Sequence, residues 1–430
     1  MAFQDVNWIR SYANKFCPTL RKKTLEWYRP SERIPCFVQD TYKSTKQKLM
    51  KIPVIVQLEN TRDNRVSARA VAESAGCRLK KELPLINSFA TEVNASSLET
   101  LVRDSNVRKI WYDGEVKALL DVATPSVQCV PLWENSVTGK GVTVAVLDTG
   151  IYNHPDLEGR IIGFADFINN EKESYDDNGH GTHVAGDIAS NGSKSDARYK
   201  GPAPEANLVG VKVLNQQGSG TLSVLVEGIQ WCIDNKQAYD IRIINLSLGS
   251  EAKEPYADDP ICQAVEKAWR SDIIVCVAAG NSGPAPRTIN TPGIHPSVIT
   301  VGALDDMNTA YLRDDNVANF SSRGPTADNL NKPDVLAPGV NIISLRSPGS
   351  TLDKQKKGNR INKWYISLSG TSMATPICAG VIAQMLQADS SLTPDMVKAR
   401  LIETAKPYPD IDKNIQGFGI IDARNAARLN

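Results

Sequence analysis

Five runs of apolar residues stand out between residues 141 and 303, and each is long enough for a strand that is buried on both faces. Between these runs, apolar residues recur every three or four positions, which predicts amphipathic helices. Leu222, Leu225, Ile229 and Cys232 form one such stripe. Strands that alternate with helices predict an α/β domain, a parallel sheet with helices on both faces. The predicted strands lie at 142–147, 208–214, 241–248, 273–279 and 298–303.

The pattern before residue 122 is different and predicts a small α+β domain. Its predicted elements are a strand at 52–58, a helix that ends at Gly76, strands within 83–93, a helix at 95–104 and strands within 107–120. The order strand–helix–strand–strand–helix–strand is ferredoxin-like. We therefore predict an N-terminal extension at 1–49, a ferredoxin-like domain at 50–121, a linker at 122–140 and the α/β domain at 141–430.

The charge of the chain is nearly balanced, with a formal net charge of +1, and gives no reason to expect nucleic acid or a membrane as a partner. Its distribution is uneven, because residues 1–124 carry a net charge of +7 and the remainder carries −6. The two parts can attract each other, or both charges can lie on solvated surfaces, and charge alone favours neither. Residues 352–363 hold four lysines and one arginine and are expected to form an exposed loop.

The cysteines and the apolar runs bear on location. No apolar run has the length of a membrane span, and residues 1–16 lack the apolar core of a secretion signal. The eight cysteines are widely spaced without a C-x-x-C pair, which suits free thiols in a reducing compartment. We therefore expect a cytoplasmic location.

Four polar residues stand where strands end or helices begin. Asp148 and Asn281 each follow a predicted strand, and His180 lies in a glycine-flanked turn before a predicted helix. Ser372 lies among small residues before an apolar helical run. Taken singly, such residues are more often turns, caps or structural groups. Because ligands bind beyond the carboxyl ends of parallel strands, however, the four can meet at one edge of the sheet.

This combination of residue types suits acyl transfer. A serine is a weak nucleophile that needs an adjacent imidazole to take its proton, and the imidazole needs a carboxylate to fix its tautomer. A helix N-terminus favours the negative charge that develops beside Ser372. The amide of Asn281 and the backbone N–H of Ser372 can both donate to that oxyanion.

The stretches around these residues resemble the subtilisin-like serine proteases, the subtilases. The motifs that carry the resemblance are DTG at 148–150, HGTHVAG at 180–186, AGN at 279–281 and GTSMATP at 370–376. The resemblance implies that Asp148, His180 and Ser372 form the catalytic triad, in the chain order known for subtilisin, with Asn281 as oxyanion donor. The whole chain is most similar to the AprX-type intracellular subtilases of bacilli, which implies that 50–121 is an inhibitory prodomain.

Two glycine-containing segments resemble the edges that hold an extended peptide in subtilases, where backbone hydrogen bonds give affinity with little demand on sequence. They are Gly218-Ser219-Gly220 and Ser247-Leu248-Gly249. The resemblance also implies a primary pocket with room for a medium or large apolar side chain. Its walls would be Ala278, Ala279, Gly280 and residues 290–293. Without the resemblance, plain turns are the alternative for both segments.

Calcium is the point at which the sequence departs from the family. Many subtilases bind calcium in the loop after the histidine-bearing helix, but residues 190–200 do not match that pattern. The acidic run from Glu171 to Asp177 offers oxygen ligands for a hard cation, although a solvated loop is the simpler interpretation. Structural calcium stays possible, we assign no metal ligands, and the chemistry requires no cofactor.

These observations predict a serine endopeptidase that is made as a self-processing proenzyme. Its partners would be peptide or protein substrates and its own prodomain, which would act as an intramolecular inhibitor. Two alternatives remain open from the sequence. One is an esterase-type acyl hydrolase with the same triad, and the other is an inactive peptide-binding module.

Overall fold

The computed structural model describes residues 7–29, 39–59, 67–83, 87–113, 120–310, 312 and 315–428. The chain divides into two compact units, Met1–Lys117 and Ala118–Asn430. Each unit has its own hydrophobic core. The predicted boundaries after residues 49 and 121 do not coincide with this division.

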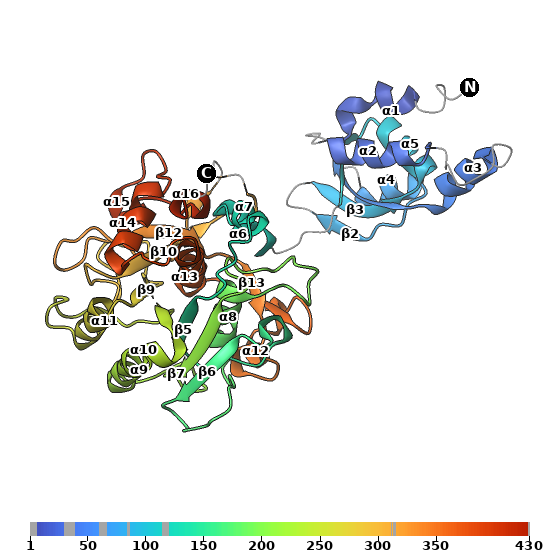
Figure 1. Cartoon of the computed structure of the whole chain (residues 1–430). Helices are drawn as coiled ribbons and strands as arrows, with labels where there is room; N and C mark the ends of the chain where they lie inside the picture. The colour runs from blue at the N-terminus through green and yellow to red at the C-terminus, as the bar shows by residue number, and fades with distance from the viewer. Residues whose placement is uncertain are drawn as a thin grey trace. The chain divides into compact units, whose positions relative to one another are not determined.

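The first unit contains an antiparallel sheet with the strand order β2–β3–β1–β4. Figure 1 labels two of these strands, β2 and β3. Its elements are β1 (Ile52–Leu58), α4 (Ala68–Ser74), β2 (Lys81–Leu83), β3 (Ser88–Val93), α5 (Ala95–Arg103) and β4 (Val107–Tyr112). This is the order of elements that the sequence predicts. Strand β1 alternates buried and half-buried residues, as a strand with one face on a core should.

Residues before β1 belong to the same unit rather than to a separate extension. They form α1 (Asn7–Ser11), η1 (Ala13–Lys15), α2 (Pro18–Glu26) and α3 (Gln39–Leu49). Trp8, Phe16, Leu20 and Trp27 are buried in one core with the strands, and the backbone N–H of Cys17 donates to the carbonyl oxygen of Ile110 on β4. Apolar burial therefore joins 1–49 to the predicted ferredoxin-like domain.

The second unit contains a sheet with the strand order β11–β10–β9–β8–β5–β7–β6, and β12 also pairs with β10. Neighbouring strands are parallel, apart from the antiparallel pair β10–β11. The strands are β5 (Thr143–Asp148), β6 (Ile161–Asp166), β7 (Asn207–Lys212), β8 (Ile241–Leu246), β9 (Ile274–Ala278), β10 (Ile299–Asp305), β11 (Asn316–Val317) and β12 (Val335–Pro338). Strands β5 and β9 are buried along their whole length.

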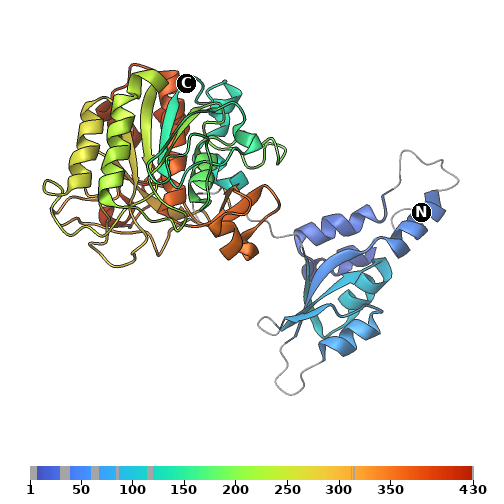
Figure 2. The ribbon, with the colours of Figure 1, turned by 90° about the horizontal axis from the view of Figure 1, so that it is seen from below.

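Helices cover both faces of this sheet (Figure 2). Helices α8 (His180–Ala189) and α13 (Thr371–Ala388) pack against each other, and α9 (Leu222–Asp234) packs against α11 (Pro260–Arg270). Helix α13 is buried from Thr371 to Leu386 apart from Ser372, because it crosses the core of the unit. The α/β fold class predicted from the sequence is confirmed.

Two segments that the sequence predicts to be irregular contain helices. The predicted linker holds α6 (Leu120–Ser126), with Pro125 inside it, and α7 (Val130–Glu134). Val127, Cys129 and Leu132 are buried in the core of the second unit, which explains why this stretch is ordered. The lysine-rich stretch at 352–363 contains most of α12 (Thr351–Gln355) and all of η5 (Lys357–Asn359), and lies between the paired strands β13 (Ile342–Leu345) and β14 (Tyr365–Leu368).

The other elements of the second unit are η4 (Pro155–Leu157), α10 (Lys236–Tyr239), α14 (Pro394–Thr404), α15 (Lys413–Gln416) and α16 (Ala423–Ala426). Within the ranges that the structure describes, no helix has both the length and the apolar character that crossing a bilayer requires.

Candidate active site

Asp148 and His180 meet at the carboxyl end of β5. Asp148 is the last residue of the strand and is fully buried, whereas 22% of the His180 side chain is exposed at the start of α8. The Nδ1 atom of His180 lies 2.8 Å from Oδ1 and 3.0 Å from Oδ2 of Asp148. Because Nδ1 faces the carboxylate, the Nε2 atom is the ring nitrogen that remains for a reacting group in the cleft that His180 lines.

A second buried carboxylate, Asp176, fixes the first turn of α8. It accepts hydrogen bonds from three backbone N–H groups within residues 178–182 and from the hydroxyl of Thr182, at 2.6 to 3.1 Å. The hydroxyl of Thr149, the residue after Asp148, also donates to Asp176 at 2.9 Å. Asp176 therefore ties the strand end that carries the acid to the helix start that carries the imidazole.

The strand end and the helix approach each other so closely that residue 181 must be glycine. A Cβ atom at Gly181 would collide with the carbonyl oxygen of Gly150 and would lie 3.1 Å from Cβ of Asp148. The glycine that follows His180 is thus a packing requirement of the Asp148–His180 pair.

Ser372 stands at the start of α13, where the first N–H groups of a helix have no partner inside the helix. Pro376 offers no N–H to the carbonyl of Ser372, and this carbonyl accepts instead from Oγ of Ser247, at 2.8 Å. In return, Oγ of Ser372 donates to the carbonyl oxygen of Ser247, at 2.9 Å. The two hydrogen bonds fix the start of α13 against the residue that follows β8.

Among the residues that the structure describes, the Ser372 hydroxyl donates to Ser247 and not to His180. Catalytic hydrogen bonds in hydrolases commonly form or tighten only when substrate binds.

Asn281 is oriented by the residue before Ser372. Its Oδ1 atom accepts from the backbone N–H of Thr371 at 2.9 Å and from the Thr371 hydroxyl at 3.1 Å. The same hydroxyl accepts from the N–H of Gly280 at 3.2 Å. Since Oδ1 is engaged, Nδ2 is the amide atom of Asn281 that can donate, and Asn281 lines one small pocket together with Ser372.

The charges near His180 favour its protonated form. Burial alone would lower the pKa of His180, but the Asp148 carboxylate, aided by Asp176 and Asp187, outweighs burial and raises the pKa above its usual value of 6.5. Burial also raises the pKa of Asp187, which holds His183 through a 2.9 Å contact one helical turn beyond His180. The raised pKa makes the imidazole of His180 a stronger base than an unperturbed histidine.

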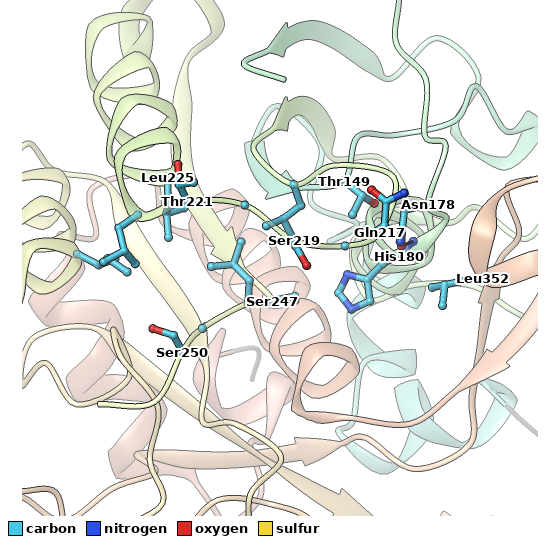
Figure 3. A pocket seen from close by; sticks show the side chains of 17 residues that line it. Thr149, Asn178, His180, Gln217, Ser219, Thr221, Leu225, Ser247, Ser250 and Leu352 are labelled. Carbon is cyan, nitrogen blue, oxygen red and sulfur yellow. Dashed lines mark hydrogen bonds between the residues drawn. The ribbon is translucent and has the colours of Figure 1, made fainter. Parts of the chain in front are cut away.

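Two connected pockets extend from these residues. The larger, a cleft of about 490 Å³, is lined by the segments 217–222 and 247–250 together with His180 and Leu352. Figure 3 shows the side chains of Ser219 and Ser247 on the two segments, with His180 and Leu352 beside them. The smaller pocket, of about 280 Å³, is lined by Ala278, Gly280, Asn290 and Ser372, and shares residues 248–249 with the cleft.

Most of the predicted substrate-binding residues line these pockets. Gly218, Ser219, Gly220, Ser247, Leu248 and Gly249 line the cleft, and Gly280 lines the smaller pocket. Ala279 differs, because its side chain is buried in a separate core cluster and its backbone bonds to Val301 and Asn290. Ala278 occupies the pocket wall instead.

Sequence reasoning missed the residues that hold the reacting groups in place. Asp176 was expected in a solvated acidic run, yet it is buried under the first turn of α8. It stands four residues before His180 and two residues before an Asn-Gly pair, which is typical of a turn, and this is the signal that could have identified it. Thr371 is likewise part of the Ser372 motif, but its contact with Asn281 depends on the fold.

The residues after α8 do not fit a calcium ion. The carboxylate that faces this loop belongs to Asp156, and it accepts hydrogen bonds from Ser190, Ser193, Tyr365 and the backbone N–H of Lys194 at 2.6 to 3.0 Å. Protein donors thus occupy the oxygen atoms that a cation would need. In the described part of the chain, no three His, Cys, Asp or Glu side chains converge as metal ligands would.

A parallel sheet with an Asp–His pair at its carboxyl edge and a serine at a helix start is the arrangement found in subtilisin-like serine proteases. A family model described as the Subtilase family matches residues 139–419. The chain belongs to the subtilase family and is a serine protease.

The relatives extend this match beyond the catalytic domain. Serine protease AprX of Bacillus subtilis (strain 168) is 50% identical over 99% of this chain and 98% of its own length. The thermostable alkaline protease of Halalkalibacterium halodurans is 35% identical over 84% of this chain and 89% of its own length. Among solved structures, that of a cold-adapted subtilisin-like serine proteinase superposes with a TM-score of 0.50 at 33% identity, over 66% of this chain and 88% of that chain. The resemblance to AprX is confirmed.

Replacing Asn281 by leucine should lower turnover far more than substrate affinity, because the amide is expected to donate mainly to the charge that develops in the transition state. The expected loss is roughly 10²–10³-fold, the magnitude known for removing one oxyanion donor from subtilisin itself. Steady-state kinetics on a peptide substrate gives kcat and KM separately. An unchanged kcat would contradict the role of Asn281.

Proposed function

We propose that this subtilase is a serine endopeptidase in which Asp148, His180 and Ser372 form the catalytic triad. The Ser372 oxygen attacks the carbonyl carbon of the peptide bond while His180 Nε2 takes the hydroxyl proton. His180 then passes that proton to the leaving amine, and water hydrolyses the acyl-enzyme by the reverse sequence. Asp148 holds the imidazole, and Asn281 with the backbone N–H of Ser372 stabilises the oxyanion.

The observation that carries this proposal is the contact of His180 Nδ1 with the buried Asp148, in a domain whose Ser372 lies in the first turn of α13 and is hydrogen-bonded to the residue after β8. When the Nδ1–H group of a neutral imidazole donates a hydrogen bond to a carboxylate, Nε2 carries no proton and can act as the base. The chemistry uses side chains and backbone groups of this chain, and we propose that it needs no cofactor.

Peptides rather than simple esters are the substrates that the cleft favours. The segments 217–222 and 247–250 line one cleft of about 490 Å³ that His180 also lines. Such paired edges suit an extended chain, which gains backbone hydrogen bonds along its length. A short ester would use only the part of the site near Ser372.

We further propose that the enzyme is a self-processing proenzyme whose inhibitor is the predicted prodomain at 50–121, of which residues 50–117 lie in the first unit. The first unit has its own core, as a separable inhibitory domain requires. The net charge of +7 on residues 1–124 against −6 on the remainder is compatible with their association, although charge alone does not require it. The proposed cytoplasmic location is supported by the free cysteines at 17, 77, 129, 232, 262, 276 and 378.

The serine role is tested by comparing wild type with Ser372→Ala on two substrates, a casein-type protein and a short-chain ester. Wild type should hydrolyse the protein with a higher kcat/KM than the ester. The variant should lose roughly 10⁶-fold in turnover, the loss that follows removal of the triad serine from subtilisin. A wild-type enzyme that cleaves only the ester would favour the acyl hydrolase. A folded chain inactive on both substrates would favour a peptide-binding module.

Self-cleavage should occur within a few residues of Leu120. The two units divide between Lys117 and Ala118. Residues 114–119, within the range 107–120 where the sequence predicts strands, lie outside the described residues. Leu120 is the first residue of α6, so a helix stands there in place of the predicted strand. A tethered segment has a high effective concentration, so even a poor site can be cut once. Intact masses should show cut wild type and uncut Ser372→Ala, and a variant still cut there without added protease would exclude autoprocessing.

A further inference from the structure

Leu352, which lines the cleft, belongs to residues 346–364, the stretch between β13 and β14, which we name the α12 segment. Buried Asp353 holds it together, since Oδ1 accepts from Nε of Arg346 at 2.5 Å and from Nε of Arg360 at 2.6 Å. Burial raises the pKa of Asp353, but the bonds from Arg346, Gly349 and Arg360 outweigh it and bring the pKa to about 2. The segment is therefore a built element and not the loose loop that its lysines suggest.

The α12 segment is fastened to the turn that precedes His180. The hydroxyl of Ser347 donates to the carbonyl oxygen of Asp176 at 2.7 Å. The backbone N–H groups of Thr351 and Leu352 donate to the carbonyl oxygens of residues 177 and 178 at 2.9 and 2.8 Å. The same turn carries His180, so the position of Leu352 relative to the imidazole is set by backbone hydrogen bonds.

Glycine at position 179 allows this close docking. Gly179 has a φ of 103°, and a Cβ atom there would lie 2.6 Å from Oγ of Ser350. Leu352 is half-buried and lines the cleft beside His180, Asn178 and Gln217 (Figure 3). It is the apolar side chain that the α12 segment presents to the cleft.

An extended substrate must place a side chain near Leu352. Residues 248–249 line both the smaller pocket, on the side of Asn290, and the cleft, on the side of His180. Successive side chains of an extended strand point in opposite directions. When one side chain enters the smaller pocket, the side chain of the preceding residue is therefore directed toward His180 and Leu352.

We propose that Leu352 is a specificity-determining residue, which contacts the substrate residue preceding the one in the smaller pocket and selects an apolar side chain there. This inference rests on the proposed endopeptidase function. Burying an apolar side chain against Leu352 lowers the free energy of the bound substrate, whereas a charged side chain would lose water there without a partner.

The test compares wild type with Leu352→Lys and Leu352→Glu on four chromogenic peptides. The peptides differ only at the proposed position, which carries Leu, Ala, Glu or Lys. Wild type should prefer Leu, Leu352→Lys should shift the Glu/Lys ratio of kcat/KM toward Glu by roughly 3- to 10-fold, and Leu352→Glu should shift it toward Lys. Leu352→Ala should reduce the preference for Leu over Ala and decides the matter if the charged variants do not fold.

Lys354→Glu is the matched control, because Lys354 is exposed on the same helix two residues away and points about 200° around the helix from Leu352. It should keep the wild-type preference. A shift of the Glu/Lys ratio of kcat/KM in Lys354→Glu equal to that in Leu352→Glu would mean a long-range charge effect and would overturn the contact with Leu352. Unchanged preferences in all folded Leu352 variants would overturn it as well. Wild type that cleaves none of the peptides and no protein would instead reject the endopeptidase function.

Discussion

The hydrogen bond between His180 and the buried carboxylate of Asp148 is the interaction on which the site depends. Asp148 occupies the end of a fully buried strand, so its position follows from the packing of the sheet. Asp176 then fixes the start of α8 against that strand end through Thr149 and the first N–H groups of the helix. The imidazole is thus oriented by the core of the protein before any substrate arrives.

The serine side of the site depends on the same core. Helix α13 crosses the unit as a buried helix and packs against α8, which carries His180. Pro376 has no N–H group to donate to the carbonyl oxygen of Ser372. The hydroxyl of Ser247, the residue after β8, donates to that oxygen instead. Because His180 and Ser372 stand at the starts of two packed helices, their positions depend on helix packing and not on loop conformation. This suits chemistry that depends on preorganised groups.

The predictable parts of the structure are those that local pattern decides. The buried strands appear in the sequence as apolar runs. Asp148 and Asn281 could be identified as candidate site residues because each stands directly after such a run. Residues 1–49 are predicted to be an extension, yet scattered aromatic residues such as Trp8 and Trp27 fill a core formed with distant strands. The α12 segment looks solvated in sequence because its buried ion pairs join Asp353 to arginines seven residues away on either side. Such contacts are tertiary, and hydrophobic periodicity carries no signal for them.

The central claim is that His180, held by Asp148, is the base for Ser372. The most direct measurement is the rate at which a fluorophosphonate modifies Ser372 across pH, followed by intact mass in wild type and Asp148→Asn. Because the pKa of His180 is raised above 6.5, the wild-type rate should fall through a single ionisation above that value as the pH is lowered. Asp148→Asn should react more slowly by on the order of 10³–10⁴-fold. A wild-type rate that stays flat down to pH ~5, or an Asp148→Asn variant that reacts at the wild-type rate, would contradict the claim.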